Sequence, residues 1–340
     1  MVRAQMAPSV LFLADPAEDY VADSLFHGLR MALGADAVDF PKRVSLYRST
    51  SSEQRAGLYG RGFGFYGLLD DIPVERDGAL ARAREGQFDA VIVGTIWRDW
   101  NWWLEVRDGV PSSVCRAVVD GSDMPWMYPY GPPWWKTPRG WFLPRAHRHA
   151  VYFKREWTRV TGWVRYWGLV PPPLSDRVPL EPIAISYPAE KIVPDTPAKS
   201  QEFASHVVDA EVAERLDRVQ TGYVFERESD YSDDLRASRW GVTTKRAGWD
   251  ALRHYEIAGN GAVPCFRRLQ RKPPRCAPHG LRPGVNCIAY ADADDLFRQV
   301  DRIDEERYLE LAAGSLAWAR ENTTARRAEL LIDRLGLAGR

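Results

Sequence analysis

The sequence predicts an α/β protein built from two Rossmann-like domains that face each other across a cleft. Short apolar runs typical of buried strands alternate with stretches of helical spacing in both halves of the chain. A proline-rich segment, residues 171–197, separates the two halves, as a hinge between domains would. The 340 residues are also enough for two ordinary domains. We therefore predict an N-terminal domain over residues 1–182 and a C-terminal domain over residues 183–340.

The balance of charge argues against several classes of partner. The 46 basic and 46 acidic residues cancel, so the composition gives no basis for a surface that binds a nucleic-acid polymer or an anionic membrane. No apolar run approaches the roughly 20 residues that a membrane-spanning helix needs. The N-terminal stretch MVRAQMAPSVLFLAD is typical of a first strand rather than of a signal peptide. We expect a cytoplasmic protein without integral membrane association.

The N-terminal domain opens with a βαβ pattern. Residues 10–14 are a continuous apolar run, which predicts a buried parallel strand, and apolar side chains recur on one face of a predicted helix over residues 19–33. Further strands are predicted at residues 36–40, 88–94, 116–120 and 149–154. Ligands collect at the C-terminal ends of parallel strands, so we expect the loops after these strands to face the cleft.

Two segments of this domain have an unusual composition. Residues 59–67, YGRGFGFYG, are rich in glycine and form either a flexible loop of the cleft or an irregular connection. They do not open a helix after a strand, so they are no dinucleotide fingerprint. Eleven of the 14 tryptophans lie between Trp97 and Trp167. Aromatic faces stack on planar ligands, so the tryptophans either line an acceptor pocket or pack in the core.

The C-terminal domain repeats the alternation of strands and helices. A short helix followed by a strand is predicted within residues 231–242. The remaining strands are predicted at 203–208, 222–225, 262–266 and 285–290, and the remaining helices at 210–220, 292–300, 304–320 and 323–336.

One stretch, residues 245–266, organises this domain. Its sequence KRAGWDALRHYEIAGNGAVPCF predicts a helix with apolar positions from Trp249 to Ile257, a glycine turn and a buried strand. Lys245 and Arg246 precede the helix, where the helix dipole and free backbone N–H groups favour an anion such as phosphate.

Residues 256–265, EIAGNGAVPC, resemble the E-A-x-A-x-G-x-P-V donor-site signature of glycosyltransferases with the GT-B fold. The resemblance is closest to the glycogen-synthase-like and mannosyltransferase-type (group 1) enzymes. It extends from about Tyr231 to the C-terminus, where a strand, a DADDL segment and the terminal helices look the same, and more loosely to the whole two-domain layout. In that family the glutamate corresponding to Glu256 binds the ribose of a sugar nucleotide. Gly248 stands where the family pattern has another glutamate.

The resemblance implies a donor site for a nucleoside-diphosphate sugar in the C-terminal domain. We assign Glu256 to the ribose, and Lys245 and Arg246 to the diphosphate. The helix carries further candidates. The complete set of predicted donor residues is Thr244, Lys245, Arg246, Arg253, His254 and Glu256.

A base for the acceptor is required only if transfer inverts the anomeric configuration; the family resemblance favours retention, which needs none. The candidates for such a base follow or precede strands of the first domain: Asp15, Asp120, Asp123, His147 and His149. No D-x-D pair has the setting of a metal site, and Cys276 with His279 is a weak match to zinc-ligand spacing. We expect neither a metal nor a cofactor, with the sugar nucleotide as co-substrate.

Three functions therefore stay open. The first is a glycosyltransferase that moves a sugar to a hydroxyl of a small, partly planar acceptor such as a nucleoside or another natural product, with a polysaccharide or lipid-linked acceptor as its variant. The second is a non-catalytic nucleotide- or sugar-binding protein of the same fold, which Gly248 favours. The third is another two-domain enzyme such as a sugar-nucleotide epimerase. The oligomeric state is left open.

Overall fold

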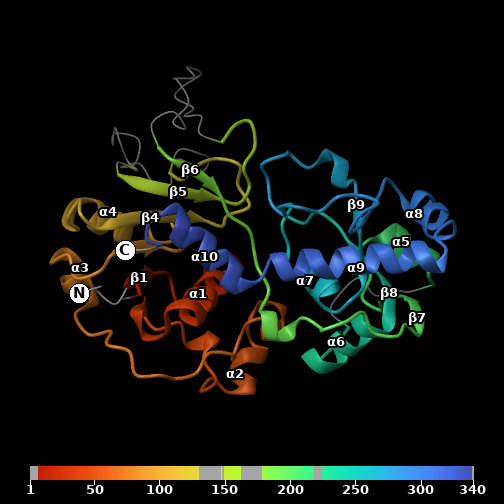
Figure 1. Ribbon diagram of the computed structural model, residues 1–340, viewed down its shortest axis with the longest axis horizontal. Helices are drawn as coiled ribbons and strands as arrows, with labels where there is room; N and C mark the ends of the chain where they lie inside the picture. The colour runs from red at the N-terminus through yellow and green to blue at the C-terminus, as the bar shows by residue number, and fades with distance from the viewer. Residues whose placement is uncertain (1–6, 130–146, 148, 162–177, 218–223, 339–340) are drawn as a thin grey trace, which may run out of the picture.

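The computed structural model describes residues 7–129, 147, 149–161, 178–217 and 224–338 (Figure 1). Within these residues the strands form two separate parallel sheets. The six-stranded sheet has the order β2-β1-β3-β4-β5-β6, and the four-stranded sheet has the order β10-β9-β8-β7. Since every hydrogen-bonded pair in both sheets is parallel, the C-terminal ends of the strands in each sheet lie along one edge.

The first sheet is buried on both faces. Its strands are β1 (Val10–Leu13), β2 (Ala37–Phe40), β3 (Ala90–Val93), β4 (Cys115–Asp120), β5 (Ala150–Lys154) and β6 (Leu180–Pro182). Alternate residues of β1 enter different cores: Val10 and Phe12 pack on one face, and Leu11 and Leu13 pack on the other. This two-sided burial explains why the strand is a continuous apolar run in the sequence.

Different helices cover the two faces of this sheet. The helices of the N-terminal half are α1 (Tyr20–Leu33), α2 (Ser52–Ala56), α3 (Ala79–Arg84) and α4 (Trp100–Gly109). Side chains of α1 share one core with those of α10 (Thr324–Arg334), whereas α3 and α4 belong to the core of the other face. Asp19 ends the loop after β1 and caps α1, because its carboxylate accepts hydrogen bonds from the backbone N–H groups of Val21 and Ala22.

The second sheet carries the remaining elements. Its strands are β7 (Gln201–Phe203), β8 (Ser238–Thr243), β9 (Val263–Arg267) and β10 (Ile288–Tyr290), and the helices around it are α5 (Ala210–Arg215), α6 (Glu228–Ala237), α7 (Leu252–Gly259), α8 (Ala293–Val300) and α9 (Glu305–Glu321). The predicted glycine turn is present, with Gly261 in the left-handed region at φ 75°. Among the described helices, none has the length and hydrophobicity needed to cross a bilayer.

Several predicted elements of this half differ from the structure. The helix predicted over 210–220 ends at Arg215, and the strand predicted over 285–290 begins at Ile288. The strand predicted over 203–208 ends at Phe203, because the Ser205 N–H leaves the sheet and donates to Asp234 Oδ2 at 2.8 Å. The helix predicted to include Trp249 begins only at Leu252. The strand predicted over 222–225 is absent at residues 224 and 225, whereas 222 and 223 lie outside the described residues.

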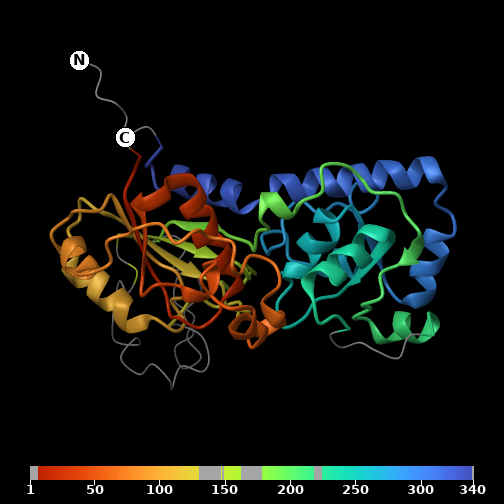
Figure 2. The same ribbon diagram turned by 90° about the horizontal axis from the view of Figure 1, so that it is seen from below.

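The chain crosses between the two sheets twice. The first crossing follows β6, and the second leads from α9 into α10, which returns to pack on α1; Figure 2 shows α9 and α10 spanning both halves of the molecule. The crossings meet at Tyr187, whose N–H donates to the Asn322 carbonyl at 3.1 Å and whose carbonyl accepts the Thr324 N–H at 3.0 Å. A Cβ on Gly28 would lie 1.9 Å from the Thr324 carbonyl oxygen, so the close approach of α1 to α10 requires glycine there.

Candidate functional site

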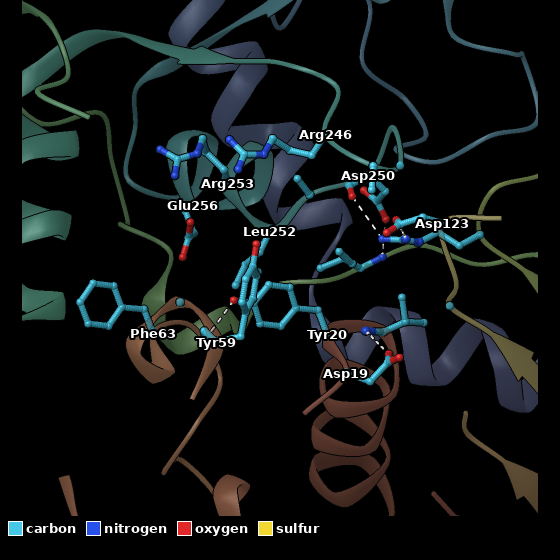
Figure 3. Close-up of a pocket in the computed structure, with 18 of the residues that line it drawn as sticks. Asp19, Tyr20, Tyr59, Phe63, Asp123, Arg246, Asp250, Leu252, Arg253 and Glu256 are labelled. Carbon is cyan, nitrogen blue, oxygen red and sulfur yellow. Dashed lines mark hydrogen bonds and ion pairs between the residues drawn. The ribbon is translucent and has the colours of Figure 1, made fainter. Parts of the chain in front are cut away.

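A cavity of about 740 Å³ lies where the C-terminal edges of the two sheets face each other. The first half contributes loops that follow β1, β3 and β4, together with the glycine-rich loop near Tyr59. The second half contributes His206 after β7, the loop after β8 and the first turns of α7. Figure 3 shows side chains from both halves converging on this space. We call it the cleft cavity.

Glu256 lies on the wall formed by α7. Its side chain is almost fully buried, and the Tyr231 hydroxyl donates to its Oε2 atom at 3.1 Å. The pKa of this carboxyl is raised to about 7, mainly by burial; the charge of Arg253 opposes the rise and the nearby Glu228 adds to it. Glu256 is therefore close to half ionised at neutral pH.

Two guanidinium groups lie beside this carboxyl on the same wall. Arg246 comes from the loop after β8, and Arg253 comes from the first turn of α7 (Figure 3). Neither makes an ion pair with a carboxylate of the described residues. Both charges are thus free to bind an anion that enters the cleft cavity.

The loop that carries Arg246 is held by residues of the other half of the molecule. The backbone N–H of Trp249 donates to Glu156 Oε1 at 2.8 Å, and buried Arg155 bonds the Asp123 carboxylate and, at 3.2 Å, the carbonyl of Asp250. Burial raises the pKa of the Asp250 carboxyl to about 6. The conformation of this loop therefore depends on residues of both halves.

Gly248 sits where these carboxylates meet. A Cβ at this position would lie 2.5 Å from Asp123 Oδ1 and 2.5 Å from Glu156 Oε1. The space that a larger side chain would need is taken by two carboxylates of the first half. This packing gives a steric reason for glycine at the position where the family pattern has glutamate.

No protein-family model and no curated protein matches the sequence. The structure does match others. HepE from Anabaena, in complex with UDP and glucose, aligns with a TM-score of 0.50 and 9% identity over 97% of this chain and 99% of that chain. A glycosyltransferase from Rickettsia africae aligns with a TM-score of 0.53 and 5% identity over 96% and 98% of the two chains. Both alignments extend over nearly the whole length of the two chains.

The chain has the GT-B fold. The predicted α/β fold with parallel sheets is confirmed, and the structure is consistent with the predicted arrangement of two units that face each other across a cleft. In the GT-B arrangement seen here, the wall with Glu256, Arg246 and Arg253 belongs to the C-terminal half, and the opposite wall belongs to the N-terminal half.

The other predicted donor residues do not line the cleft cavity of this GT-B protein. Thr244 and Lys245 line a different cavity on the other side of the same loop. His254 is fully buried, with Nδ1 bonded to Thr243 Oγ1 at 2.9 Å and Nε2 bonded to the Trp249 carbonyl at 3.0 Å. Burial lowers the pKa of His254 to about 4, so the ring is neutral and has no nitrogen left for a phosphate.

Of the five candidate bases, Asp123 lines the cleft cavity, where its side chain is 45% exposed. Asp120 is fully buried. Its carboxylate accepts hydrogen bonds from the Tyr152 hydroxyl at 2.5 Å and from Lys154 Nζ at 2.8 Å, so it is already engaged within the protein. Asp15 does not line the cavity, and its carboxylate accepts the backbone N–H of Ala17 at 2.9 Å.

The two candidate histidines also lie away from the cleft cavity. His147 is buried, and its Nε2 atom lies 2.6 Å from the Tyr128 carbonyl oxygen; burial lowers its pKa to about 4. His149 directly precedes β5 and has a left-handed backbone at φ 62°. It is therefore at the N-terminal end of a parallel strand, opposite the edge where the cavity lies.

The N-terminal wall includes residues that the sequence reasoning did not select. Asp19 and Tyr20 reach the cavity from the start of α1, and Tyr59 packs on Tyr20 with ring centroids 5.6 Å apart. Asp19 follows the first strand and begins an amphipathic helix, so its capping position was visible in the sequence. The aromatic pairing was not, because it joins segments distant in the chain.

The sequence analysis left two roles open for the tryptophans, lining an acceptor pocket or packing in the core. The described tryptophans include examples of both positions. Trp97 lines the cleft cavity, whereas Trp100 and Trp103 are buried in the core beneath α4. Trp134, Trp135, Trp141, Trp163 and Trp167 lie outside the described residues.

Among the described residues, no group of His, Cys, Asp or Glu side chains is placed to hold a metal ion. The Cys276 thiol instead donates to Glu156 Oε2 at 2.9 Å.

Proposed function

We propose that this protein is a glycosyltransferase that moves a sugar from a nucleoside-diphosphate sugar to a hydroxyl of a small acceptor. One observation carries the proposal: Glu256, Arg246 and Arg253 share one wall of a cavity between the two halves of a GT-B fold. The same fold in HepE holds UDP with glucose, and UDP-glucose. A nucleoside diphosphate requires a group that accepts hydrogen bonds from the ribose hydroxyls and cations that bind its phosphates. Glu256 can supply the first, and the two guanidinium groups, which have no ion pair among the described residues, can supply the second.

In this proposal the donor binds to the C-terminal wall. The ionised carboxylate of Glu256 accepts hydrogen bonds from the ribose hydroxyls. Arg246 and Arg253 bind the diphosphate, since a guanidinium group can chelate phosphate oxygens with two hydrogen bonds. The same two cations stabilise the charge that develops on the leaving diphosphate, so we propose transfer without a metal ion.

The acceptor binds to the N-terminal wall, which presents exposed aromatic and apolar side chains. Tyr59, Trp97 and Met124 line the cavity from this side and are at least 36% exposed, which suits the planar face of a nucleoside or another natural product. If transfer inverts the anomeric configuration, Asp123 is the base, because it is the sequence-predicted candidate that reaches the cavity. Retention would need no base.

The test is a calorimetric and thermal-shift screen of nucleoside diphosphates, with and without Mg²⁺. It uses the wild type, Glu256→Ala and the exposed control Glu214→Ala. The expected result is stabilisation by one or a few nucleotides that does not depend on magnesium, is lost in Glu256→Ala and is kept in the control. No stabilisation by any nucleotide would leave the fold without the proposed activity.

A binding protein without turnover would pass this screen, so turnover is measured separately. Release of free sugar from the matching sugar nucleotide, or its transfer to a hydroxylated aromatic acceptor, is expected from a transferase. Binding without either reaction would identify a sugar-nucleotide-binding protein, and interconversion of free sugar nucleotides would identify an epimerase.

A further inference from the structure

A second cavity, of about 710 Å³, lies on the other side of the loop that carries Arg246. It also sits at the C-terminal edge of the second sheet, and its lining comes from the loops that follow β7, β8 and β9. Among the residues that the structure describes, none lines both cavities. We call this second space the basic cavity.

The charges around the basic cavity do not balance. Four cationic side chains line it, with two carboxylates, those of Asp209 and Glu211. Both carboxylates are engaged by one cation, Arg267: its Nη1 lies 3.0 Å from Asp209 Oδ1 and its Nη2 lies 2.6 Å from Glu211 Oε1. The other three cations, Lys245, Arg268 and Arg271, make no ion pair with a carboxylate in the part of the chain that the structure describes.

The three unpaired cations come from two loops. Arg268 directly precedes the short 3-10 helix after β9 (Leu269–Arg271), Arg271 is its last residue, and both are exposed. Lys245 comes from the loop after β8, where its ammonium group donates to the carbonyls of Arg246 at 3.3 Å and Ala247 at 3.0 Å. Three like charges around one cavity repel each other, and a bound anion would offset that repulsion.

The other residues that line the basic cavity indicate which class of anion it would bind. Thr244 contributes a hydroxyl to the rim, and Trp249 forms an aromatic wall near Lys245, with Nζ 5.9 Å from the ring centroid. Two guanidinium groups, an ammonium group and a hydroxyl suit a doubly charged tetrahedral oxyanion better than a single carboxylate. The aromatic wall gives a carbon skeleton attached to such an anion a surface to pack against.

We propose that the basic cavity is a second ligand site that binds a phosphoryl group, either as free phosphate or as the phosphomonoester of a small molecule. This site is distinct from the cleft cavity, and both can be occupied at once. The proposal holds whether or not the protein transfers sugar, because none of the described residues that line the basic cavity lies on the C-terminal wall of the cleft cavity.

The test measures calorimetric binding of inorganic phosphate and of glycerol 1-phosphate to the full chain. Arg268→Gln/Arg271→Gln removes two cations from the basic cavity, and Arg302→Gln/Arg326→Gln removes two exposed cations elsewhere. Lys245 is left intact, because its bonds reach the loop that also lines the cleft cavity. Arg246→Gln removes a cation of the cleft cavity only.

The wild type is expected to bind at millimolar concentration or tighter, and the Arg268→Gln/Arg271→Gln variant to bind at least about tenfold more weakly. The Arg302→Gln/Arg326→Gln variant should bind like the wild type. With the cleft cavity saturated by nucleoside diphosphate, the wild type and Arg246→Gln should still bind the ligand at the basic cavity with the same affinity. Tighter binding of the ester than of phosphate would identify an organic ligand, and equal binding would identify free phosphate.

Three outcomes would overturn the proposal: no binding by the wild type, equal binding by the Arg268→Gln/Arg271→Gln and Arg302→Gln/Arg326→Gln variants, or loss of binding in Arg246→Gln. If the first double variant unfolds, Arg271→Gln alone gives the same test. Failure of nucleotide binding in the cleft cavity would not affect these results, so the two proposals fail separately.

Discussion

The two walls of the cleft cavity differ in chemistry. The N-terminal wall presents the exposed side chains of Tyr59, Trp97 and Met124. Its charged residues Arg98 and Asp123 are already paired, with Asp15 and Arg155 respectively. On the C-terminal wall, Arg246 and Arg253 make no ion pair with a described carboxylate, so this wall suits the charged part of a ligand and the N-terminal wall suits a planar or apolar part. Under the proposed function, the C-terminal wall would recognise the charged donor and the N-terminal wall the acceptor.

The walls also differ in how they are supported. Tyr59 is fixed within its own half, since its N–H donates to Glu18 Oε1 at 3.2 Å and its carbonyl accepts the Tyr20 hydroxyl at 3.3 Å. The loop with Arg246 is fixed by Arg155 and Glu156 from the opposite half. The charged wall therefore depends on both halves of the molecule, and four perturbations test this contrast.

The largest effect is expected from removing the charges of the C-terminal wall. Arg246→Ala/Arg253→Ala should weaken nucleoside-diphosphate binding by roughly a hundredfold or more, because each hydrogen-bonded charge contributes about 1.5–3 kcal/mol. Calorimetry measures the loss, with Arg302→Ala/Arg326→Ala as the control for net charge. Binding by the first variant that equals that of the control would remove the phosphate assignment.

A methyl group at Gly248 should break the support of the charged wall. Gly248→Ala places its Cβ against the Asp123 and Glu156 carboxylates, and we expect it to lower the free energy of unfolding by about 1–3 kcal/mol. Gly57→Ala is the matched control, since its nearest contact is an ordinary 3.6 Å. Denaturant unfolding compares the two variants. Equal free energies of unfolding would show that the loop shifts to accommodate the methyl group without loss of stability.

The ionisation of Glu256 should make donor binding depend on pH. With a pKa of about 7, the carboxyl is about one tenth ionised at pH 6 and about nine tenths ionised at pH 8. Affinity for a nucleoside-diphosphate sugar, whose diphosphate does not titrate in this range, should rise up to about tenfold across it. Glu256→Gln should flatten the profile, and a profile that it leaves unchanged would assign the pH dependence to another group.

The raised pKa of Glu256 also affects the stability of the fold. Stability should fall with rising pH, whereas donor affinity should rise. Because folding raises the pKa of Glu256 above its ordinary value of 4.5, the folded state binds more protons between pH 4.5 and pH 7. The contribution of this carboxyl to stability is therefore greatest below pH 4.5 and falls as pH rises to about 7. Comparing unfolding of the wild type and Glu256→Gln over this range checks the sign.

The smallest effects are expected from the exposed aromatic side chains on the N-terminal wall of the cleft cavity. Tyr59→Ala and Trp97→Ala should each raise KM for a planar acceptor severalfold, because one stacked ring contributes about 1 kcal/mol. Donor affinity should not change, and Tyr59→Phe should keep the acceptor KM. Equal losses of donor and acceptor binding would contradict the division between the two walls.

The sequence predicted those features that depend on local pattern. The apolar run at Val10 is a strand because both of its faces are buried, and the last two helices match their predicted ranges within two residues. Glu256 and the turn at Gly261 were placed through a family signature. Each of these features depends on residues that are close together in the chain.

The sequence could not predict the directions of side chains in the loop after β8. Lys245 and Arg246 are adjacent and were assigned to one phosphate, yet they line different cavities. The loop is not helical there, because Glu156, distant in the sequence, binds the backbone of Trp249 before the helix begins. His254 was predicted on the helix, but its burial depends on packing against Phe266, with ring centroids 4.6 Å apart.

The meeting of the two crossings at Tyr187 determines how the two halves can move. Its backbone is bonded to the Asn322 carbonyl and the Thr324 N–H, so the two connections are joined at one point instead of acting as two separate tethers. An opening of the cleft that preserves these bonds keeps the two connections together at this point. We therefore expect the residues next to Tyr187 to be displaced least when the protein admits or releases a ligand.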